Sequence, residues 1–475
     1  MQDVFKIRKD KLEKLKEKNL DPFKINRFCK TQISKIKEEF IEGKLVKTAG
    51  RILSQRLHGK SCFIDIKDFT DKIQVYARKD ILKERYEDFL DLDIGDIVGI
   101  EGELFKTRTG EVTINVKDFV LLSKSLRVLP EKWHGLKDTE LRFRYRYLDL
   151  ISNPKTKEIF LMRTKILDFI RNFLKEKGFI EVETPILQIL PGGAAGSPFK
   201  THHKVLDLDL YLRIAPELYL KRLLVGGFER VFEIGRNFRN EGISTKHNPE
   251  FTMLEAYAAY TDYEFMMDLC EELFSSMAKE FFKKEEITFA HKKIDLKRPW
   301  KRISFAKILE EKLGVLPTDS EKEISEKILR YKDLNSQKLS RSQITKLCEE
   351  IVESECKSQP VFITDYFSFM SPLAKPKAEN PNIAERFELF IGGLEIGNAY
   401  TELNDPFLQR KKFEEQLEDE DADLKKIDED FLTALEYGMP PASGLGLGID
   451  RICMLFTDTT SIREVILFPL LKPSQ

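Results

Sequence analysis

Cysteines are few in this sequence, and none is placed like a metal ligand. The six cysteines form no CxxC pair and no cysteine–histidine spacing of a zinc site. His202 and His203 are adjacent, so a strand would point them to opposite faces, which is poor geometry for binding one metal ion. We therefore expect reduced thiols, as in a cytoplasmic protein.

Long apolar runs are missing too. No stretch of about 18 apolar residues occurs, so the sequence predicts no transmembrane helix. The first residues, MQDVFKIRKDKLEKL, are charged throughout and lack the apolar centre of a signal peptide. These absences favour a cytoplasmic location and no membrane partner.

An excess of charge is also lacking, because 79 basic residues face 80 acidic ones. The net charge of the chain therefore indicates no particular binding partner. Locally, residues 1–37 hold 12 Lys or Arg and 5 Asp or Glu. Such a run is usually a solvated face, and attraction to nucleic acid is the sharper alternative.

The common glycine-rich nucleotide motifs are absent as well. Gly59-Lys60-Ser61 resembles the end of a phosphate loop, but Ser54 stands where that loop requires glycine. Alternate glycines at 444, 446 and 448 do not match the dinucleotide spacing. In a strand they leave one face bare, which suits either a flat ligand or tight packing, and the spacing does not choose between them.

The texture of the sequence predicts two main domains. Residues 1–43 form a basic helical segment, and 44–122 carry five short alternating runs typical of an all-β OB-fold barrel. Residues 123–154 are predicted to be a linker. Residues 155–475 mix helix and hairpin patterns, which favours an α+β domain on an antiparallel sheet flanked by helices, with a charged helical insertion at 318–357.

One polar loop and the strand after it stand out, in FRNEGISTKHNPEFTMLEAYAAY, residues 238–260. Arg239 follows a predicted strand, and a guanidinium can bind phosphate or carboxylate through two hydrogen bonds. Phe251, Met253, Glu255 and Tyr257 share one face of the next strand by its period of two. An aromatic ring beside polar groups is unusual for a core and suits a stacked adenine next to a polar pocket.

Three ordered motifs carry a family resemblance. RNFRNEG…HNPEFTMLE resembles motif 2 of class II aminoacyl-tRNA synthetases, GLGLGIDR resembles motif 3, and the helix before GFIEVETPIL resembles motif 1. GGLEIGNAYTELNDPFLQR, LRFRYRYLDL and APELYLKRL are similar to the bacterial-type lysyl-tRNA synthetase branch of subclass IIb. The likeness covers nearly the whole chain, including the barrel.

This resemblance implies a lysine–tRNA ligase that uses ATP and Mg²⁺ and acts on L-lysine and tRNA(Lys) as a homodimer joined through motif 1. It implies Arg239 and Arg451 as catalytic residues and two carboxylates as Mg²⁺ ligands, Glu388 and Glu395. It assigns ATP to Arg239, Glu241, His247, Asn248, Phe251, Glu388 and Arg451. It assigns lysine to Gly193, Glu217, Glu255, Tyr257, Asn398, Tyr400 and Glu402.

The barrel is similar to the anticodon-binding domain of the same family. Phe63 and Gln74 occupy positions that stack on and hydrogen-bond the central anticodon base, and Arg56 and Glu111 are further candidates. Taken alone, Phe63 would more simply be a core aromatic residue. Gln74 beside it favours the anticodon role.

Two details depart from expectation. Ser197 stands where many relatives have arginine, and Lys246 replaces a more usual arginine. In addition, Glu395, Asn398 and Glu402 have helical spacing inside a predicted strand, so lining one pocket requires a bulge or bend near Gly397.

Two rival functions remain open at this stage. An adenylate-forming paralogue that modifies a protein would lack the barrel, which is present here. A catalytically inactive tRNA-binding or regulatory protein would not need Arg239, Glu388, Glu395 and Arg451. Specificity for aspartate or asparagine is disfavoured, because an acidic side chain would meet Glu402 rather than a cation.

Overall fold

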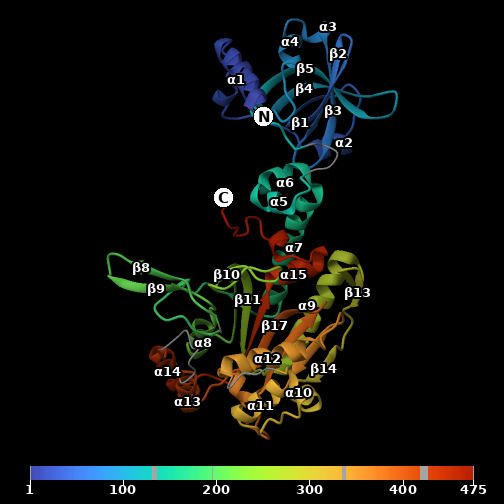
Figure 1. Cartoon of the computed structure of the whole chain (residues 1–475). Coiled ribbons are helices and arrows are strands. Elements are labelled where there is room, and N and C mark those ends of the chain that lie inside the picture. Colours follow the sequence, from blue (N-terminus) through green and yellow to red (C-terminus); the bar gives the residue numbers. More distant parts are fainter. Residues whose placement is uncertain (1, 131–135, 195, 334–338, 418–425, 474–475) are drawn as a thin grey trace. The chain divides into compact units, whose positions relative to one another are not determined.

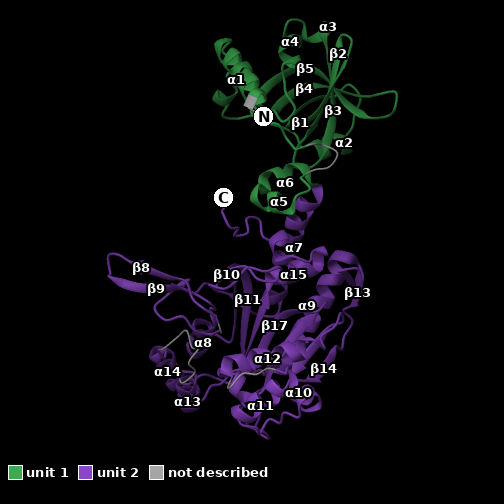
Figure 2. Ribbon diagram, viewed as in Figure 1, with its two compact units in different colours: residues 1–153 green, residues 154–475 purple. Residues whose placement is uncertain are grey.

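The computed structural model describes residues 2–130, 136–194, 196–333, 339–417 and 426–473. The chain divides into two compact units, Met1–Asn153 and Pro154–Gln475 (Figures 1 and 2). Each unit has its own hydrophobic core. No helix of the described residues is long and apolar enough to cross a membrane.

Unit 1 is built around a closed five-stranded barrel with strand order β1-β2-β3-β5-β4, as expected for an OB fold. Alternate residues of β2 point inward, and Cys62, Ile64 and Ile66 are fully buried. The strands are β1 (Leu45–His58), β2 (Ser61–Lys67), β3 (Lys72–Arg78), β4 (Ile97–Lys106) and β5 (Val112–Ser123).

Helices flank this barrel in the chain. The basic N-terminal segment is helical over α1, and α3 and α4 connect β3 to β4. Residues 123–154, predicted as a linker, contain two short helices that belong to unit 1, while 131–135 lie outside the described residues. The helices are α1 (Gln2–Glu17), η1 (Pro22–Lys24), α2 (Ile33–Glu38), α3 (Lys79–Leu82), α4 (Arg85–Leu90), α5 (Thr139–Arg144) and α6 (Arg146–Ser152).

Unit 2 is organised by an eight-stranded sheet of order β14-β15-β16-β17-β18-β11-β10-β6. The inner pairs are antiparallel, and the pair at each edge is parallel. The strands are β6 (Ile180–Glu181), β10 (Arg230–Phe238), β11 (Glu250–Ala259), β14 (Lys301–Ser304), β15 (Val361–Thr364), β16 (Arg386–Ile391), β17 (Leu394–Thr401) and β18 (Ala442–Gly448).

One face of this sheet is covered by α7 (Pro154–Glu176), α9 (Tyr263–Phe282) and α15 (Ile449–Thr457) (Figure 1). Their apolar residues pack with Leu254 and Ala256 of β11 and with Leu445 and Leu447 of β18. Residues between these positions in the strands must therefore face away from the helices, because successive strand side chains alternate. The opposite face is the one that carries the polar residues singled out above.

The bulge predicted near Gly397 is confirmed. In the β16–β17 hairpin, Leu389 pairs with Gly397 and Phe390 pairs with Glu395, so Ile396 is an extra residue on β17. A bulge of this kind reverses the alternation of side chains along the strand. Glu395 and Asn398 can therefore line the same cavity although they are three residues apart.

The other elements of unit 2 surround this sheet. The expected insertion contains α11 and α12, and residues 334–338 lie outside the described ranges. Two small sheets are formed by β7 (Leu187–Gln188), β8 (Lys200–His203) and β9 (Leu208–Leu212), and by β12 (Glu286–Phe289) and β13 (Lys292–Asp295). The helices are α8 (Glu217–Val225), α10 (Phe305–Leu313), α11 (Glu321–Tyr331), α12 (Arg341–Glu353), η2 (Ser368–Met370), α13 (Pro406–Leu417), α14 (Glu429–Glu436) and α16 (Ile462–Val465).

Candidate active site

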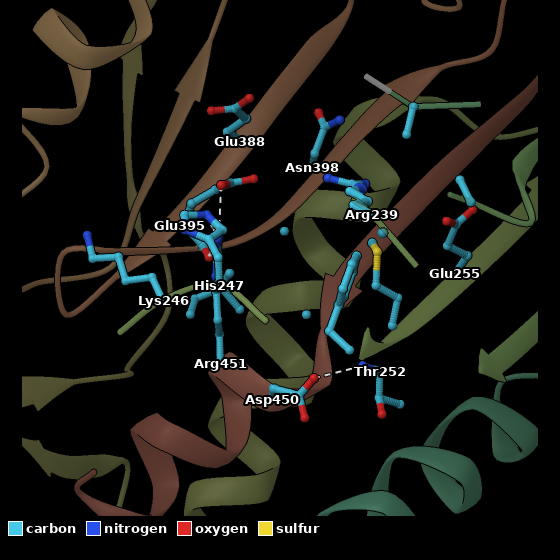
Figure 3. A pocket seen from close by; sticks show the side chains of 18 of the residues that line it. Arg239, Lys246, His247, Thr252, Glu255, Glu388, Glu395, Asn398, Asp450 and Arg451 are labelled. Carbon is cyan, nitrogen blue, oxygen red and sulfur yellow. Dashed lines mark hydrogen bonds and ion pairs between the residues drawn. The ribbon is translucent and has the colours of Figure 1, made fainter. Parts of the chain in front are cut away.

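A cavity of about 400 Å³ lies over the face of the sheet that the helices leave uncovered. Strands β11, β16, β17 and β18 form its floor, and α8, α15 and the loop after β10 contribute to its walls. Figure 3 shows charged side chains from these separate segments around one space. The cavity has two chemically different ends, one rich in cations and one rich in buried carboxylates.

Arg239 lies at the cationic end, directly after β10. Its guanidinium lies 5.2 Å from the centre of the Phe251 ring, and its Nε has no hydrogen-bond partner among the described residues. Burial lowers the pKa of Arg239 from its ordinary value. A buried cation with an unused donor is a ready site for an anion, because it is costly to leave unpaired.

Arg451, in the first turn of α15, lies beside it (Figure 3). Its Nη1 donates to the backbone oxygen of Glu395 at 2.6 Å and to Glu395 Oε2 at 2.9 Å. Its Nη2 lies 3.2 Å from His247 Nε2. Burial and the Arg451 charge lower the pKa of His247, so the imidazole is neutral near pH 7.

The motif 2 loop supplies two further groups to the cavity. Asn248 is buried and donates from Nδ2 to the backbone oxygen of Glu250 at 2.6 Å, while its Oδ1 has no hydrogen-bond partner in the described part of the chain. Glu241 is exposed and lines the same cavity. The loop therefore offers an acceptor and a carboxylate beside the Phe251 ring.

Glu388 and Glu395, the two expected metal ligands, both line this cavity. Glu388 accepts hydrogen bonds from Arg386 Nη2 at 2.6 Å and from the Tyr366 hydroxyl at 2.7 Å. Burial and the nearby carboxylate of Glu395 raise the pKa of Glu388, although Arg386 opposes this shift. Burial would also raise the pKa of Glu395, but Arg451 holds it below its ordinary value.

The other end of the cavity is acidic. Glu255 is buried on β11 and accepts a hydrogen bond from the Tyr257 hydroxyl at 3.1 Å. Burial and the neighbouring Glu217 raise the pKa of Glu255 to about 8. Such a carboxyl is mostly protonated at pH 7 until a cation arrives.

Glu217 begins α8 at the same end. Its Oε1 accepts a hydrogen bond from the Tyr400 hydroxyl at 2.5 Å and lies 2.7 Å from Lys221 Nζ. Gly193 lies against it with φ of +86°, and a Cβ there would stand 2.8 Å from the Glu217 Cβ. Glycine at 193 is therefore required by both the backbone conformation and the close approach.

Glu402 lies just behind the cavity wall rather than in it. It has no exposed surface, its Oε2 forms an ion pair with Lys221, and its Oε1 meets no hydrogen-bond donor among the described residues. Its Oε1 abuts Gly444, which does line the cavity. A buried carboxylate with unused lone pairs at the cavity wall is suited to receive an ammonium group.

The three alternate glycines of β18 differ in their surroundings. A Cβ at Gly444 would overlap Glu402 and Tyr257, whereas at Gly448 it would meet atoms no closer than 3.7 Å. At Gly446 the nearest atom would be the Met253 Cε at 3.1 Å. Tight packing thus explains Gly444, and a bare surface open to a ligand explains Gly448.

The barrel residues expected at the anticodon lie together on its outer face. Phe63 pairs with Tyr76 across β2 and β3, their ring centres are 4.5 Å apart, and Phe63 is half-buried outside the core cluster. Gln74 is buried, accepts from the Thr113 hydroxyl at 3.0 Å and donates to Glu111 Oε2 at 3.4 Å. Arg56 pairs with Phe63 across β1 and β2 and is exposed.

Sequence reasoning missed three residues that organise these sites. Arg386 donates to both Glu388 and Asn398, and its spacing of two from Glu388 on a strand was a usable signal. Lys221 lies four residues after Glu217 on α8, the spacing at which helical side chains meet. Tyr76 stacks on Phe63 from a neighbouring strand, which no local pattern reveals.

Fold and cavity together match one class of protein: a synthetase with a mainly antiparallel sheet, a cavity lined by Arg239 and Arg451, and an OB-fold domain. The family described as tRNA synthetases class II (D, K and N) matches residues 138–472, and the OB-fold nucleic acid binding domain matches 46–122. The chain belongs to the class II tRNA synthetases (D, K and N).

Curated relatives narrow this further. The lysine–tRNA ligase of Pelotomaculum thermopropionicum is 52% identical, covering 100% of this chain and 96% of the relative. That of Thermoanaerobacter sp. (strain X514) is 51% identical, covering 100% and 97%. That of Clostridium tetani is 48% identical, covering 98% and 95%.

Proposed function

We propose that this protein is a lysine–tRNA ligase. It joins L-lysine to ATP to form lysyl-adenylate and pyrophosphate, and then transfers lysine to the terminal ribose of tRNA(Lys). The observation that carries the proposal is the acidic end of the cavity, where Glu217, Glu255 and Glu402 are all buried. The relatives support it, since all three are lysine–tRNA ligases.

The amino acid fits the acidic end in one orientation. Its α-ammonium group meets Glu217 beside Gly193, and its side-chain ammonium meets Glu402 and the Tyr257 hydroxyl. Asn398 and Arg239 receive its carboxylate, while Tyr400 and Glu255 complete the wall. This orientation leaves the carboxylate pointing toward the cationic end, where the reaction takes place.

ATP fits the cationic end. Its adenine stacks on Phe251, with Glu241 at its amino group and Asn248 nearby, and Arg451 and His247 face the phosphates. Arg239 binds the α-phosphate and the amino-acid carboxylate together, which its unused donor supports. Arg239 and Arg451 are the residues that we propose as catalytic.

The carboxylates of Glu388 and Glu395 fit a Mg²⁺ ion. Among the described residues no group of three or more His, Cys, Asp or Glu could hold a metal ion by itself. Mg²⁺, however, is commonly held by one or two carboxylates and by substrate phosphates, so two facing carboxylates in a phosphate site match its needs. When bound, this ion would supply positive charge to the phosphates.

The chemistry that remains for the protein is positioning and charge neutralisation. An oxygen of the lysine carboxylate attacks the α-phosphorus, the bond to the bridging oxygen breaks, and pyrophosphate leaves. The carboxylate is already ionised at pH 7, so no general base is required. Arg239 aligns the two reacting groups, and Arg239 and Arg451 stabilise the charge of the transition state.

We assign tRNA(Lys) recognition to the barrel. Phe63 stacks on the central anticodon base and Gln74 hydrogen-bonds it, with Arg56 and Glu111 at the sides. The half-buried outer position of the Phe63 ring supports this role, because single-stranded nucleic acid is commonly bound by aromatic stacking on OB folds. The segment 1–43 offers further positive charge.

We also propose a cytoplasmic homodimer. The motif 1 segment exposes apolar side chains at Ile180, Ile186, Leu187 and Ile189, and an exposed apolar cluster of this kind favours self-association. Sedimentation equilibrium should give twice the mass of the chain. A monomer at micromolar concentration would contradict the dimer.

The test of the proposed activity is ATP–pyrophosphate exchange with each of the twenty amino acids, followed by aminoacylation of tRNA(Lys). We expect exchange with lysine alone and transfer of lysine to this tRNA. Exchange with another amino acid would overturn the specificity. Lysine-dependent exchange without transfer to tRNA would instead favour a ligase that modifies another acceptor.

A further inference from the structure

Lys221 is a buried cation inside the proposed lysine site. It lies on α8, one turn after Glu217, and its side chain has no exposed surface. Its Nζ lies 2.7 Å from Glu217 Oε1 and forms a second ion pair with Glu402. An internal ammonium group thus contacts two of the carboxylates that we assign to the substrate.

The geometry divides the oxygens of these carboxylates. Lys221 faces Oε1 of Glu217, which also accepts from the Tyr400 hydroxyl, and it faces Oε2 of Glu402. Oε1 of Glu402 instead abuts Gly444 in the cavity wall. The ammonium meets both carboxylates at ion-pair distance, so it is a fixed positive charge between them.

Lys221 neutralises part of the negative charge of the proposed lysine site. Glu217, Glu255 and Glu402 are three buried carboxylates, and Lys221 is the one cation that forms ion pairs with any of them among the described residues. Two negative charges then remain when all three carboxylates are ionised. Free lysine brings two ammonium groups, and Arg239 meets its carboxylate, so the charges of the bound state are balanced, which low-dielectric sites require.

We propose that Lys221 is a specificity-determining positioning residue of the lysine site. Its fixed ammonium lies between Glu217 and Glu402 and neutralises one of the three carboxylates, so that the pocket matches a substrate with two ammonium groups. This inference rests on the proposed lysine activation and adds a residue to it.

The ionisation behaviour of the site supports this role. Burial would lower the pKa of Lys221, but Glu217 and Glu402 raise it, so the lysine stays charged. Burial raises the pKa of Glu402 well above its ordinary value, and Lys221 opposes that shift without cancelling it. The other titratable groups that face Glu402 from α8, β11 and β17 are Glu217, Glu255, Tyr257 and Tyr400.

The consequence is a defined pH dependence. Without Lys221, the pKa of Glu402 rises further, so Glu402 holds a proton more tightly in the empty site and lysine binds well only after that proton leaves. Low pH then weakens lysine binding more than it does in the unaltered protein, and high pH restores part of it. A protonated Glu402 also tolerates a neutral side chain better than an ionised one does.

The experiment uses full-length Lys221→Met, which keeps the unbranched chain and removes the charge. In ATP–pyrophosphate exchange at pH 6.5, 7.5 and 8.5, we expect the lysine KM to rise about tenfold or more at pH 6.5, since one pKa unit corresponds to a tenfold change. The rise should shrink at pH 8.5, and the ATP KM should stay within about threefold. The preference for lysine over L-norleucine should fall about tenfold or more.

Lys412→Met is the matched control. Lys412 is also buried, but its Nζ binds Ser368 and the backbone oxygen of Ser371 rather than carboxylates. It should leave the pH dependence and the lysine to norleucine ratio unchanged. An equal effect of both variants would reduce Lys221 to a packing residue and overturn the inference.

A double variant keeps the test decisive if Lys221→Met alone does not fold. Glu402→Gln with Lys221→Met removes both charges of one ion pair and leaves two carboxylates for two ammonium groups. Added to Glu402→Gln, the second change should raise the lysine KM by less than about threefold, since coupled residues are not additive. A full additive loss would overturn the inference, whereas an unaltered protein without lysine-dependent exchange would defeat the proposed function itself.

Discussion

Glu402 carries a large local cost in the candidate site, because it is a carboxylate with no exposed surface and with one oxygen that meets no hydrogen-bond donor among the described residues. Removing one partner of a buried ion pair typically costs about 3–5 kcal/mol, which is the order of the penalty for leaving Glu402 unpaired. Lys221 offsets part of this cost in the free protein. We expect a substrate ammonium group to offset the rest, so that binding of lysine also removes the free-energy cost of the buried Glu402 charge.

Replacing Glu402 by Gln should therefore affect one substrate and spare the other. We expect the lysine KM in ATP–pyrophosphate exchange to rise about tenfold or more, because a charged hydrogen bond contributes about 1.5–3 kcal/mol. The ATP KM should change less than about threefold. Equal effects on both KM values would remove Glu402 from the lysine site, and the exposed Glu429→Gln serves as control.

Glu255 makes a separate prediction about pH. Its pKa of about 8 in the empty site means that it is protonated at pH 7, and an ammonium group favours the ionised form. Lysine binding should therefore release a proton and tighten as pH rises from 6.5 to 8. Calorimetry in buffers of different ionisation enthalpy measures this release, and Glu255→Gln should reduce it.

An undiminished proton release in the Glu255→Gln variant would contradict that assignment. The sign of this pH dependence follows from the raised pKa of Glu255. A carboxyl group that holds its proton more tightly in the free site must release that proton to bind a cation. Binding that weakens between pH 6.5 and 8 would exclude Glu255 as the source.

At the scale of elements, β18 connects the acidic and the cationic end of the cavity along its length. Gly444 lies against Glu402 and Tyr257, and Gly448 lies against Arg451. Gly444→Ala should raise the lysine KM sharply, because its methyl group would overlap both neighbours. Gly448→Ala has room in the protein and should raise mainly the ATP KM.

The steady-state KM values of both glycine variants for lysine and for ATP test this order of the proposed substrates along β18. Each variant is the control for the other, since both place one methyl group on the same face of the same strand. A larger lysine effect for Gly448→Ala than for Gly444→Ala would reverse the proposed order of the substrates along β18.

Local sequence signals account for much of the element structure. Asp262 is the N-cap of α9 and accepts from the backbone N–H groups of Glu264 and Phe265, and Lys283 ends this helix in the left-handed conformation. The bulge in β17 was predictable because three polar residues had the wrong spacing for one face of a regular strand. By contrast, β6 covers only two residues of FIEVETP, because it pairs with β10 only at Val231 and Phe232.

Long-range partners could not be predicted in the same way. The ion pair of Lys221 with Glu402 joins α8 to the end of β17, and the two residues are far apart in sequence. Arg386 could be seen beside Glu388, but its hydrogen bond to Asn398 depends on the register of β16 and β17. The family motifs predicted the residues of the candidate site, whereas the hydrogen-bond and ion-pair partners of these residues could be identified only from the structure.

At the scale of the molecule, the two compact units allow the anticodon role to be separated from catalysis. Phe63→Ala should weaken aminoacylation of tRNA(Lys) through its KM, because stacking on one base contributes about 1–3 kcal/mol. ATP–pyrophosphate exchange should stay unchanged, since the barrel has its own core. Tyr76→Ala, which removes the ring stacked on Phe63, should show the same pattern.

Equal losses in both assays would assign Phe63 to the stability of the protein instead. The fully buried Phe89 provides that comparison, because Phe89→Ala leaves a cavity in the barrel core and should lower the melting temperature. A tRNA-specific loss without a shift in melting temperature distinguishes recognition from unfolding.

Asp450, in the first turn of α15, accepts hydrogen bonds from α7 and from β11. Asp450 directly precedes Arg451 in the sequence. One of its oxygens accepts from Arg163 of α7 at 2.7 Å. The other accepts from the backbone N–H of Thr252 at 2.7 Å (Figure 3). Asp450 therefore joins α7 and β11 to the first turn of α15, which carries Arg451. We expect dissociation of the proposed homodimer on dilution to raise the ATP KM more than the lysine KM.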